Sequence, residues 1–271
     1  MRIVVKVGTS TLAYSTGCLN IRHVELLVKT LSDLKNAGHE IILVSSGAIG
    51  MGVGRLSLKG KPQDMPTKQA AASVGQCELM YTYDRLFGEY NHIVGQILLT
   101  GADFSHADRK ENFENTLQRL LELGVIPVVN ENDTIATDEI SVGDNDTLAA
   151  MAACSAQADL LILLSDIDGL YTEDPHKNKD AQLIPLVTEI TPEIMQLADG
   201  EGSGLGTGGM ITKISAARIA MEHNMDMVIA NGAHPRRLYD IVEGKSIGTR
   251  FQKQIPENTN CTSSSRRPGN L

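Results

Sequence analysis

Spacings that identify metal sites and disulfide frameworks are missing from this sequence. The four cysteines form no CxxC pair, and the seven histidines form no HExxH or similar arrangement. A zinc site or a set of structural disulfides would need such spacing. We therefore predict reduced thiols, as in a cytoplasmic protein, and no metal-ligating residue. The cysteines are Cys18, Cys77, Cys154 and Cys261.

Long hydrophobic runs are absent as well. No window reaches the roughly 18 apolar residues of a membrane-spanning helix, and Lys6 interrupts the apolar run at the N-terminus, which argues against a secretory signal. The formal net charge of −9 disfavours binding to nucleic acid or to an anionic membrane. We expect a cytoplasmic protein with neither partner, although a local positive site can still bind an anionic ligand.

The fingerprints of several common enzyme classes do not occur. Glycines between Gly47 and Gly54 follow the order GxxGxGxG rather than GxGxxG, which disfavours a Rossmann dehydrogenase. The P-loop pattern GxxxxGK[ST] and the nucleophile elbow GxSxG are also missing. Ser46 is therefore predicted to hydrogen-bond an anion rather than to act as a nucleophile.

Short apolar runs alternate with helical patterns along the chain. A chain of 271 residues forms one large domain or two small ones, and this alternation is typical of an α/β fold with an open, mainly parallel sheet. The chain from about residue 252 to 271 is polar and aperiodic, so we expect a disordered or artificial tail there. The predicted strands are 3–7, 41–44, 93–99, 125–129, 160–164 and 227–230, and the predicted helices are 24–34, 66–87, 113–121, 146–156 and 210–221.

Unusual residues recur where predicted strands end. They are Lys6 to Gly8, Ser45 to Gly47, Asn130 to Asp133, and the pair Ser165-Asp166. Ligands of open α/β sheets bind at the carboxyl ends of the strands, so this placement predicts a single cleft. A buried lysine in a strand is costly without an anion. Lys6 therefore either extends its ammonium group to an edge or reaches a negatively charged ligand in the cleft.

Two acidic, amide-rich segments lie between a predicted strand and a predicted helix, at 130–134 and 143–147. Asn side chains both donate and accept, which suits a ligand with an ammonium and a carboxylate, and Asp133 is a plausible partner for the ammonium. The Asp144-Asn145-Asp146 run has the chemistry to organise lysines or to make outer-sphere contacts to Mg²⁺. Asp144 and Asn145 favour a functional role, whereas for Asp146 a helix cap is as plausible as a function.

A glycine-rich segment, Gly204 to Gly209, precedes a predicted helix that contains Lys213. Glycines that open onto a helix expose backbone N–H groups and the positive end of the helix dipole, an arrangement suited to phosphate. The alternative is a surface loop followed by an ordinary exposed lysine. The segment alone does not decide between them.

Taken together, these motifs resemble the amino acid kinase family, and within it the branch that phosphorylates the γ-carboxylate of free L-glutamate. The resemblance runs from about residue 2 to about residue 250, in the family's order. The NENDT and GDND segments are specific to this branch, whereas the lysine strand and the GTGGM loop are more widespread. The matching stretches are VVKVGTS from Val4, LVSSGAIGMG from Leu43, VVNENDT from Val128, SVGDNDTLAA from Ser141, LLSDIDGLYT from Leu163 and GTGGMITK from Gly206.

The resemblance implies a three-layer αβα sandwich over residues 1–251, with glutamate on the N-terminal part and ATP on the part from about residue 160. It also implies Mg²⁺, a place at the start of proline biosynthesis, a homodimer or homotetramer, and feedback inhibition by L-proline at a site that overlaps the glutamate site. Many members of this branch carry a C-terminal PUA domain, and none is expected in this sequence.

The resemblance also implies roles for individual residues. Lys6 and Lys213 neutralise the transferred phosphoryl group, Asp144 holds both ammonium groups in place, and the backbone amides of Gly8 and Gly47 contact phosphoryl oxygens. A γ-carboxylate is already an anion at neutral pH, so the acceptor needs no general base. The implied glutamate-binding residues are Ser46, Asp133 and Asn145, and the implied ATP-binding residues are Lys6, Ser165, Asp166, Thr207, Gly208, Gly209, Met210, Ile211, Thr212 and Lys213.

Other functions remain open from the sequence. A sister kinase would act on N-acetylglutamate, aspartate, carbamate or UMP, and a substrate panel would separate these enzymes. A catalytically silent protein that binds nucleotide or amino acid is a different class, disfavoured because both lysines and Asp144 are present.

Overall fold

The computed structural model describes residues 1–14, 16, 18–60, 62–136, 145–175, 177–198 and 209–252. These residues form a sheet of eight strands in the order β3-β4-β2-β1-β5-β7-β8-β6. The predicted tail from 253 to 271 lies outside the described residues, as do Asp144, Thr207 and Gly208. The strands are β1 (Arg2–Val7), β2 (Glu40–Ser45), β3 (Val94–Leu99), β4 (Ile126–Glu131), β5 (Leu160–Ser165), β6 (Leu186–Val187), β7 (Asp226–Asn231) and β8 (Thr249–Phe251).

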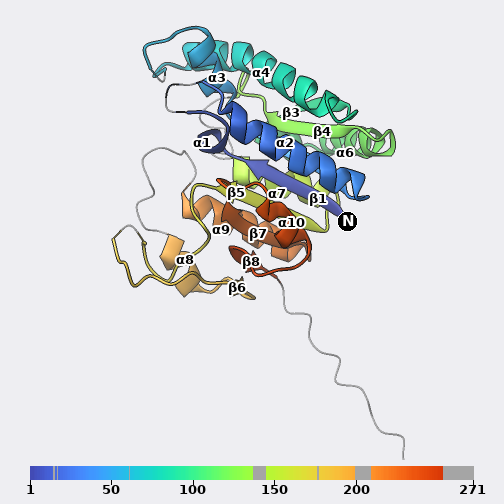
Figure 1. The fold of residues 1–271 in the computed structure, drawn as a ribbon. Helices are drawn as coiled ribbons and strands as arrows, with labels where there is room; N and C mark the ends of the chain where they lie inside the picture. The colour runs from blue at the N-terminus through green and yellow to red at the C-terminus, as the bar shows by residue number, and fades with distance from the viewer. Residues whose placement is uncertain are drawn as a thin grey trace, which may run out of the picture.

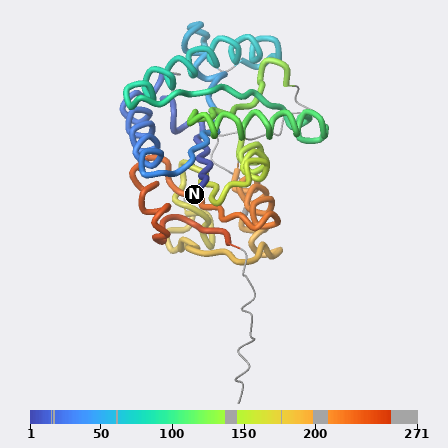
Figure 2. Tube along the Cα trace, turned by 90° about the vertical axis from the view of Figure 1, so that its right-hand side faces the viewer, coloured from blue at the N-terminus to red at the C-terminus, as the bar shows by residue number. Residues whose placement is uncertain are grey.

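The sheet is mainly parallel, as the sequence predicted. Strand β1 pairs in parallel with β2 on one side and with β5 on the other, and the antiparallel pair is β7 with β8. In Figure 2 the N-terminal strand lies between the green segments before residue 136 and the orange segments after residue 209. The first strand of the chain is therefore central in the sheet.

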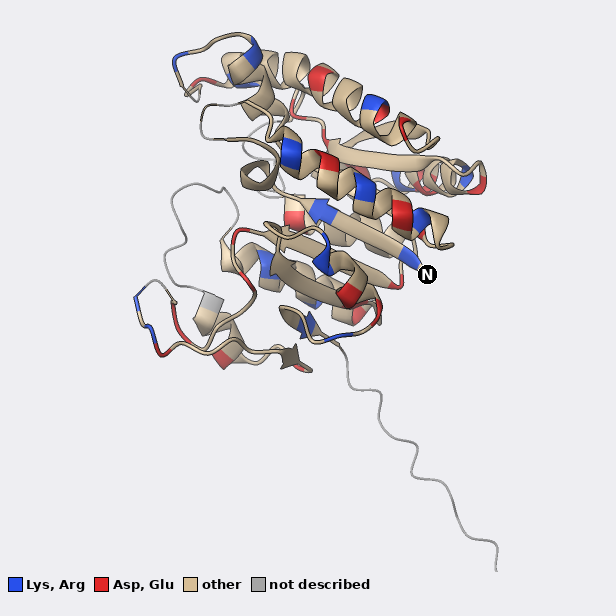
Figure 3. Ribbon diagram, viewed as in Figure 1, with Lys and Arg blue, Asp and Glu red and all other residues tan. Residues whose placement is uncertain are grey.

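Helices cover both faces of the sheet (Figure 1). One core cluster joins α2, α4 and α10 to one face, and a second joins α6, α7 and α9 to the other, which confirms the three-layer αβα sandwich. Acidic and basic residues both occur along α2 and α4, whereas few residues of the strands are charged (Figure 3). The helices are α1 (Thr9–Leu12), α2 (Ile21–Asn36), α3 (Ala48–Arg55), α4 (Met65–Gly88), α5 (Gly101–Ser105), α6 (Ala107–Glu122), α7 (Asn145–Ser155), α8 (Pro192–Ala198), α9 (Met210–Glu222) and α10 (Arg237–Val242).

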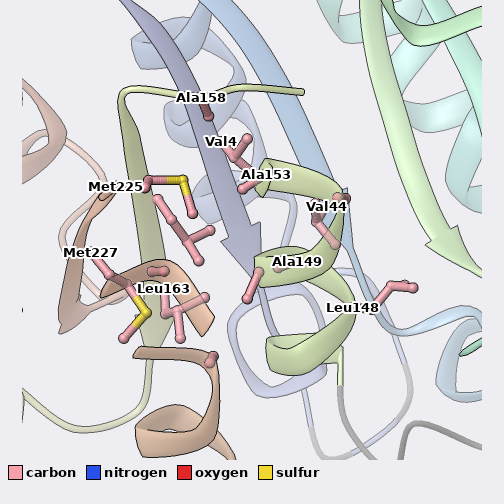
Figure 4. Close-up of a cluster of buried hydrophobic side chains, with 14 of the residues drawn as sticks. Val4, Val44, Leu148, Ala149, Ala153, Ala158, Leu163, Met225 and Met227 are labelled. Carbon is pink, nitrogen blue, oxygen red and sulfur yellow. The ribbon is translucent and has the colours of Figure 1, made fainter. Parts of the chain in front are cut away.

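Strand β1 shows why a lysine can occupy a buried strand. Side chains alternate between the faces of a strand, and Ile3, Val5 and Val7 pack in the core with α2 while Val4 packs in the core with α7. Lys6 follows Val4 at the same parity, so it points toward the layer of α7 and α9. Figure 4 shows Val4 beside alanines of α7. The small helix side chains on this side leave space for the long lysine.

Helices α3 and α4 are in backbone contact through two glycines. A Cβ on Gly52 would lie 1.8 Å from the carbonyl oxygen of Ala71, and one on Gly75 would lie 1.7 Å from the carbonyl oxygen of Ala48. Real Cβ atoms never approach an oxygen so closely, so the two helices can pack at this distance only with glycine at both positions.

Several elements were not expected from the sequence. No helix was predicted for the glycine-rich stretch Gly47 to Gly54, yet Ala48–Arg55 is the helix α3. Glycine disfavours a helix by about 1 kcal/mol, but packing against α4 overrides that preference. The strands β6 and β8 were also missed, because two- and three-residue strands give no period. Among the described residues, no helix is long and apolar enough to cross a membrane.

Candidate active site

The strands β4, β2, β1 and β5 lie side by side and run in the same direction, so their carboxyl ends meet at one edge. Asn130, Ser45, Lys6 and Ser165 lie at or near these four ends. The sequence predicted a single cleft from the same positions. The structure brings them to one edge of the sheet, where α1, α3, α7 and α9 begin nearby.

Two lysines from distant parts of the chain meet at one carboxylate. Lys6 Nζ lies 2.6 Å from Asp146 Oδ1, and Lys213 Nζ lies 2.9 Å from Asp146 Oδ2. Asp146 is 0% exposed, Lys6 is 5% exposed and Lys213 is 6% exposed. The trio carries two positive charges and one negative charge, so a net positive charge is held at the edge of an otherwise acidic protein. Such a site suits an anionic ligand.

Alanine-rich helices bring this trio together. Asp146 lies in the first turn of α7, and Lys213 lies in the first turn of α9. Both helices bury alanines with little or no exposed surface, including Ala149 and Ala153 of α7 and Ala217 of α9. Small side chains permit a close approach of the two axes, and Figure 4 shows the α7 alanines against the sheet. The approach allows Lys213 to reach a carboxylate on the neighbouring helix.

The sequence assigned the role of holding both ammonium groups to Asp144, and the structure shows Asp146 making both contacts. Asp144 itself lies outside the described residues. A helix-cap role for Asp146 was the alternative, but its two oxygens bind lysines, and Thr212 Oγ1 donates to Oδ2 at 3.2 Å. The sequence could not separate the two aspartates because both lie within one short polar run.

Asn145, just before Asp146, links the ends of two strands, β2 and β4. Its amide nitrogen lies 2.8 Å from the carbonyl oxygen of Ser45, 2.6 Å from Ser46 Oγ and 3.1 Å from Asn130 Oδ1. Asn130 is 1% exposed. Of the predicted glutamate-binding residues, Ser46 and Asn145 are therefore in direct contact, and their neighbour Asn130 joins them from β4.

Asp133 lies in the turn that follows β4. The backbone N–H groups of Ile135 and Ala136 donate to the Asn132 carbonyl, and Gln69 of α4 donates to the Ala136 carbonyl at 3.3 Å. Burial raises the pKa of the Asp133 carboxyl to about 6, because desolvation disfavours its charged form. A nearby cation, such as an ammonium group, would stabilise the charged form of this half-buried carboxyl.

Two glycines shape the backbone around the lysines. Gly47 has φ +95°, a conformation that favours glycine, and it begins α3. A Cβ on Gly8 would lie 3.8 Å from Lys6 Nζ, so any side chain there would contact the ammonium group. Glycine at residue 8 therefore places no side chain against the ammonium group from this position.

Apart from Lys6 on β1, the described residues that were predicted to bind the nucleotide lie at the end of β5 and at the start of α9. Ser165 ends β5 and donates to Asp166 Oδ1 at 3.1 Å, and Gly209 precedes the first turn of α9. In that turn Ile211 is exposed, while Thr212 also donates to the Gly209 carbonyl at 2.8 Å. The predicted residues Thr207 and Gly208 lie outside the described part of the chain.

Sequence reasoning missed residues behind the site. Tyr83 of α4 is fully buried, and its hydroxyl lies 2.9 Å from Ser45 Oγ. Gln76 of the same helix accepts a hydrogen bond from the Asn130 amide at 2.8 Å. Both residues occupy ordinary helical positions, so only the tertiary structure reveals their contact with the strand ends.

Comparison with known proteins gives consistent results. The profile of the amino acid kinase family matches residues 1–231. The glutamate 5-kinase of Clostridium perfringens is 52% identical over 254 residues, covering 92% of this chain and 94% of that protein. The glutamate 5-kinase of Clostridium tetani is 55% identical over 249 residues, covering 92% and 93%.

Solved structures support the same fold at low identity. Carbamate kinase from Giardia lamblia, bound to AMP-PNP, has a TM-score of 0.68 at 16% identity and covers 93% of this chain and 98% of that chain. UMP kinase from Ureaplasma parvum has a TM-score of 0.65 at 15% identity, with the same coverage. These likenesses show the fold, and the much higher identities given above show the branch. The chain therefore belongs to the amino acid kinase family and, within it, to the glutamate 5-kinases.

Proposed function

We propose that this protein transfers the γ-phosphoryl group of ATP to the γ-carboxylate of L-glutamate, giving L-glutamyl 5-phosphate and ADP as the first step of proline biosynthesis. The N-terminal part of the chain binds glutamate, and the part from about residue 160 binds ATP. The observation that carries the proposal is the trio of Lys6, Asp146 and Lys213, which holds two ammonium groups at one edge of the sheet.

The geometry suits transfer between two anions. Phosphoryl transfer needs positioning and neutralisation of charge rather than covalent chemistry by the protein. Lys6 approaches from β1 and Lys213 from α9, so each ammonium can neutralise a different oxygen of the travelling group. Ser46 and Asp133 follow the ends of β2 and β4, and Asn145 begins α7. These three residues position the acceptor, whose carboxylate attacks without loss of a proton. Backbone amides of Gly8 and Gly47 contact phosphoryl oxygens.

Mg²⁺ is expected to enter with the nucleotide. The described residues contain no cluster of three His, Cys, Asp or Glu side chains suited to a metal ion, and both oxygens of Asp146 already bind lysines. Mg²⁺ keeps several waters and commonly takes its remaining ligands from substrate phosphates, so this site fits a nucleotide-bound ion. When bound, Mg²⁺ adds positive charge to the β- and γ-phosphates.

A hydroxamate assay tests the reaction. L-Glutamyl 5-phosphate is an acyl phosphate, and hydroxylamine traps it as a coloured hydroxamate when ATP, Mg²⁺ and glutamate are present. N-Acetylglutamate, aspartate, carbamate and UMP should give less turnover than glutamate, measured by ADP release. A silent binding protein would give neither hydroxamate nor ADP, and either that result or preference for another acceptor would refute the proposal.

Removing either lysine should slow the chemical step. We expect Lys6→Ala and Lys213→Ala to lower kcat by about 10²-fold or more, the scale for loss of one preorganised charge. Lys→Arg at either position should also impair kcat, because a planar fork does not replace a compact ammonium. Lys245→Ala removes a lysine from an exposed ion pair and serves as the control. A folded alanine variant with near-normal kcat would exclude that lysine from catalysis.

Glutamate capture should depend on the ionisation of Asp133. Its pKa is raised to about 6, so the carboxylate that binds an ammonium is present above pH 6 and is lost as the pH falls through that value. We expect kcat/KM for glutamate to fall below about pH 6, because kcat/KM reports ionisations of the free enzyme. Asp133→Asn should lower kcat/KM and remove this bend, while an unchanged profile in the variant would contradict the assignment.

Regulation and assembly follow the family. We expect L-proline to inhibit competitively with glutamate, tested by the hydroxamate assay with and without proline, and we expect a homodimer or homotetramer, tested by light scattering.

Cys18, Cys77 and Cys154 are free thiols among the described residues, which supports a reducing, cytoplasmic location.

A further inference from the structure

A chain of four amide side chains runs from the edge strand β3 to the substrate end of the site. Gln76 Nε2 donates to Gln96 Oε1 at 2.9 Å, Asn130 Nδ2 donates to Gln76 Oε1 at 2.8 Å, and Asn145 Nδ2 donates to Asn130 Oδ1 at 3.1 Å. Gln96 is exposed, but Gln76 is 7% exposed and Asn130 is 1% exposed. The chain therefore joins solvent to the site, and its middle hydrogen bond, between Asn130 and Gln76, is buried.

A backbone group fixes the direction of this chain. The N–H of Glu131 can only donate, and it donates to Asn130 Oδ1 at 2.9 Å. The oxygen of Asn130 must therefore face that N–H, and its NH₂ group must face Gln76 Oε1. If the Gln76 amide were reversed, two NH₂ groups would face each other in a buried position, which costs the desolvation of both donors.

The orientation of the Asn145 amide is fixed in the same way. Its NH₂ group faces three oxygen atoms, those of Ser45, Ser46 and Asn130. A reversed amide would set its carbonyl oxygen against the carbonyl oxygens of Ser45 and Asn130, so the observed orientation is strongly preferred. Asn145 therefore turns its own oxygen away from the chain, as an acceptor. The ammonium group is the strongest donor that a free amino acid brings.

We propose that Gln76 is a positioning residue that, through Asn130, fixes the side-chain amide of Asn145 for recognition of the amino acid substrate. The inference rests on the proposed function, because it assigns Asn145 to glutamate. Gln76 touches neither substrate nor nucleotide in this scheme. Its effect is therefore confined to the affinity for glutamate, and the lysine trio remains as it is.

The principal test is Gln76→Met, which keeps the length of the side chain and removes its hydrogen bonds. We expect KM for glutamate to rise about tenfold, the scale of one buried neutral hydrogen bond, with kcat and KM for ATP within about twofold of wild type. Thr82→Val is the matched control, since Thr82 is also buried on α4 and its hydroxyl donates to the carbonyl of Glu78 in the same helix. This control should leave both KM values unchanged.

Two further variants separate positioning from general disruption. Gln76→Glu keeps an acceptor for Asn130, and the exposed Gln96 amide can turn to donate to the new carboxylate, so KM for glutamate should return to within about threefold of wild type. Gln96→Met changes an exposed residue that folding tolerates. It removes the oxygen that accepts from the Gln76 NH₂ group, so the Gln76 side chain is held by one hydrogen bond fewer, and KM for glutamate should rise about twofold to threefold.

The outcomes distinguish this inference from the proposed function. A wild-type enzyme that forms no hydroxamate with glutamate refutes the proposed function and the inference with it. An active wild type whose Gln76→Met variant keeps the same KM for glutamate refutes the inference alone. Equal changes in kcat and in both KM values, with no recovery in Gln76→Glu, would show a structural role and also refute it. If Gln76→Met does not fold, an unchanged KM for glutamate in Gln96→Met refutes the inference alone.

Discussion

Asp146→Asn should lower kcat by roughly 10³-fold, at the upper end of the effect of one preorganised electrostatic group. The substitution keeps the shape of the side chain and removes its charge. Lys6 and Lys213 would then lose the charge of the carboxylate that both contact at this buried site. Their ammonium groups would repel, so neither would remain where the transferred group needs it.

The same variant should also be less stable. Removing one partner from a buried charge cluster costs about 3–5 kcal/mol, because the remaining charges stay desolvated. Asp240→Asn is the control, since Asp240 makes a 2.6 Å ion pair with Lys245 at an exposed position, and exposed pairs contribute about 1 kcal/mol or less. Denaturant unfolding and the hydroxamate assay measure the two effects. An Asp146→Asn enzyme with more than a tenth of wild-type kcat would show that this carboxylate is not the organiser.

Gly75→Ala is expected to be the most damaging small change outside the lysine trio. The new Cβ would lie 1.7 Å from the carbonyl oxygen of Ala48, so α3 and α4 would have to separate. Overpacking of this kind costs about 3 kcal/mol or more, which corresponds to a melting temperature lower by about 6–12 °C in a protein of this size. Since α3 follows Ser46 and α4 carries Gln76, KM for glutamate should rise as well.

Gly88→Ala provides a control within the same helix. Nothing lies within 4 Å of a Cβ at Gly88, so this variant should match or slightly exceed the wild-type stability, because alanine favours a helix. Thermal unfolding of the two variants compares one added methyl group in two environments. Equal melting temperatures for both would contradict the close packing of α3 against α4.

The sequence predicted most of the central sheet because its strands are rich in β-branched residues or leucine, as in 3–7 and 160–164. The meeting of the polar strand ends at one edge could also be predicted, because the carboxyl ends of parallel strands lie together. The strand that contains Lys6 did not show whether its ammonium group reaches an edge or binds an anionic ligand. Only the resemblance to the family favoured a catalytic role. These inferences depend on local composition and on a general rule of topology.

The remainder depends on contacts between distant segments. The contact of Asp146 with both lysines depends on how α7 and α9 pack against each other, and no local pattern encodes that packing. The close contact of Gly52 with Ala71 turns a glycine-rich stretch into a helix by tertiary packing. Gln76 lies in the middle of a long helix with a weakly amphipathic sequence, so its link to Asn130 is invisible until the fold is known.

The central position of β1 has a consequence for motion. Its residues pair with β2 on one side and β5 on the other, so the peptide groups around Lys6 can meet solvent only when the whole molecule opens. Their amide hydrogens should exchange with heavy water at the rate set by global unfolding, far more slowly than those of edge strand β3. The ammonium group of Lys6 is thus attached to the least mobile part of the protein. Any closing movement around ATP must come from the other elements.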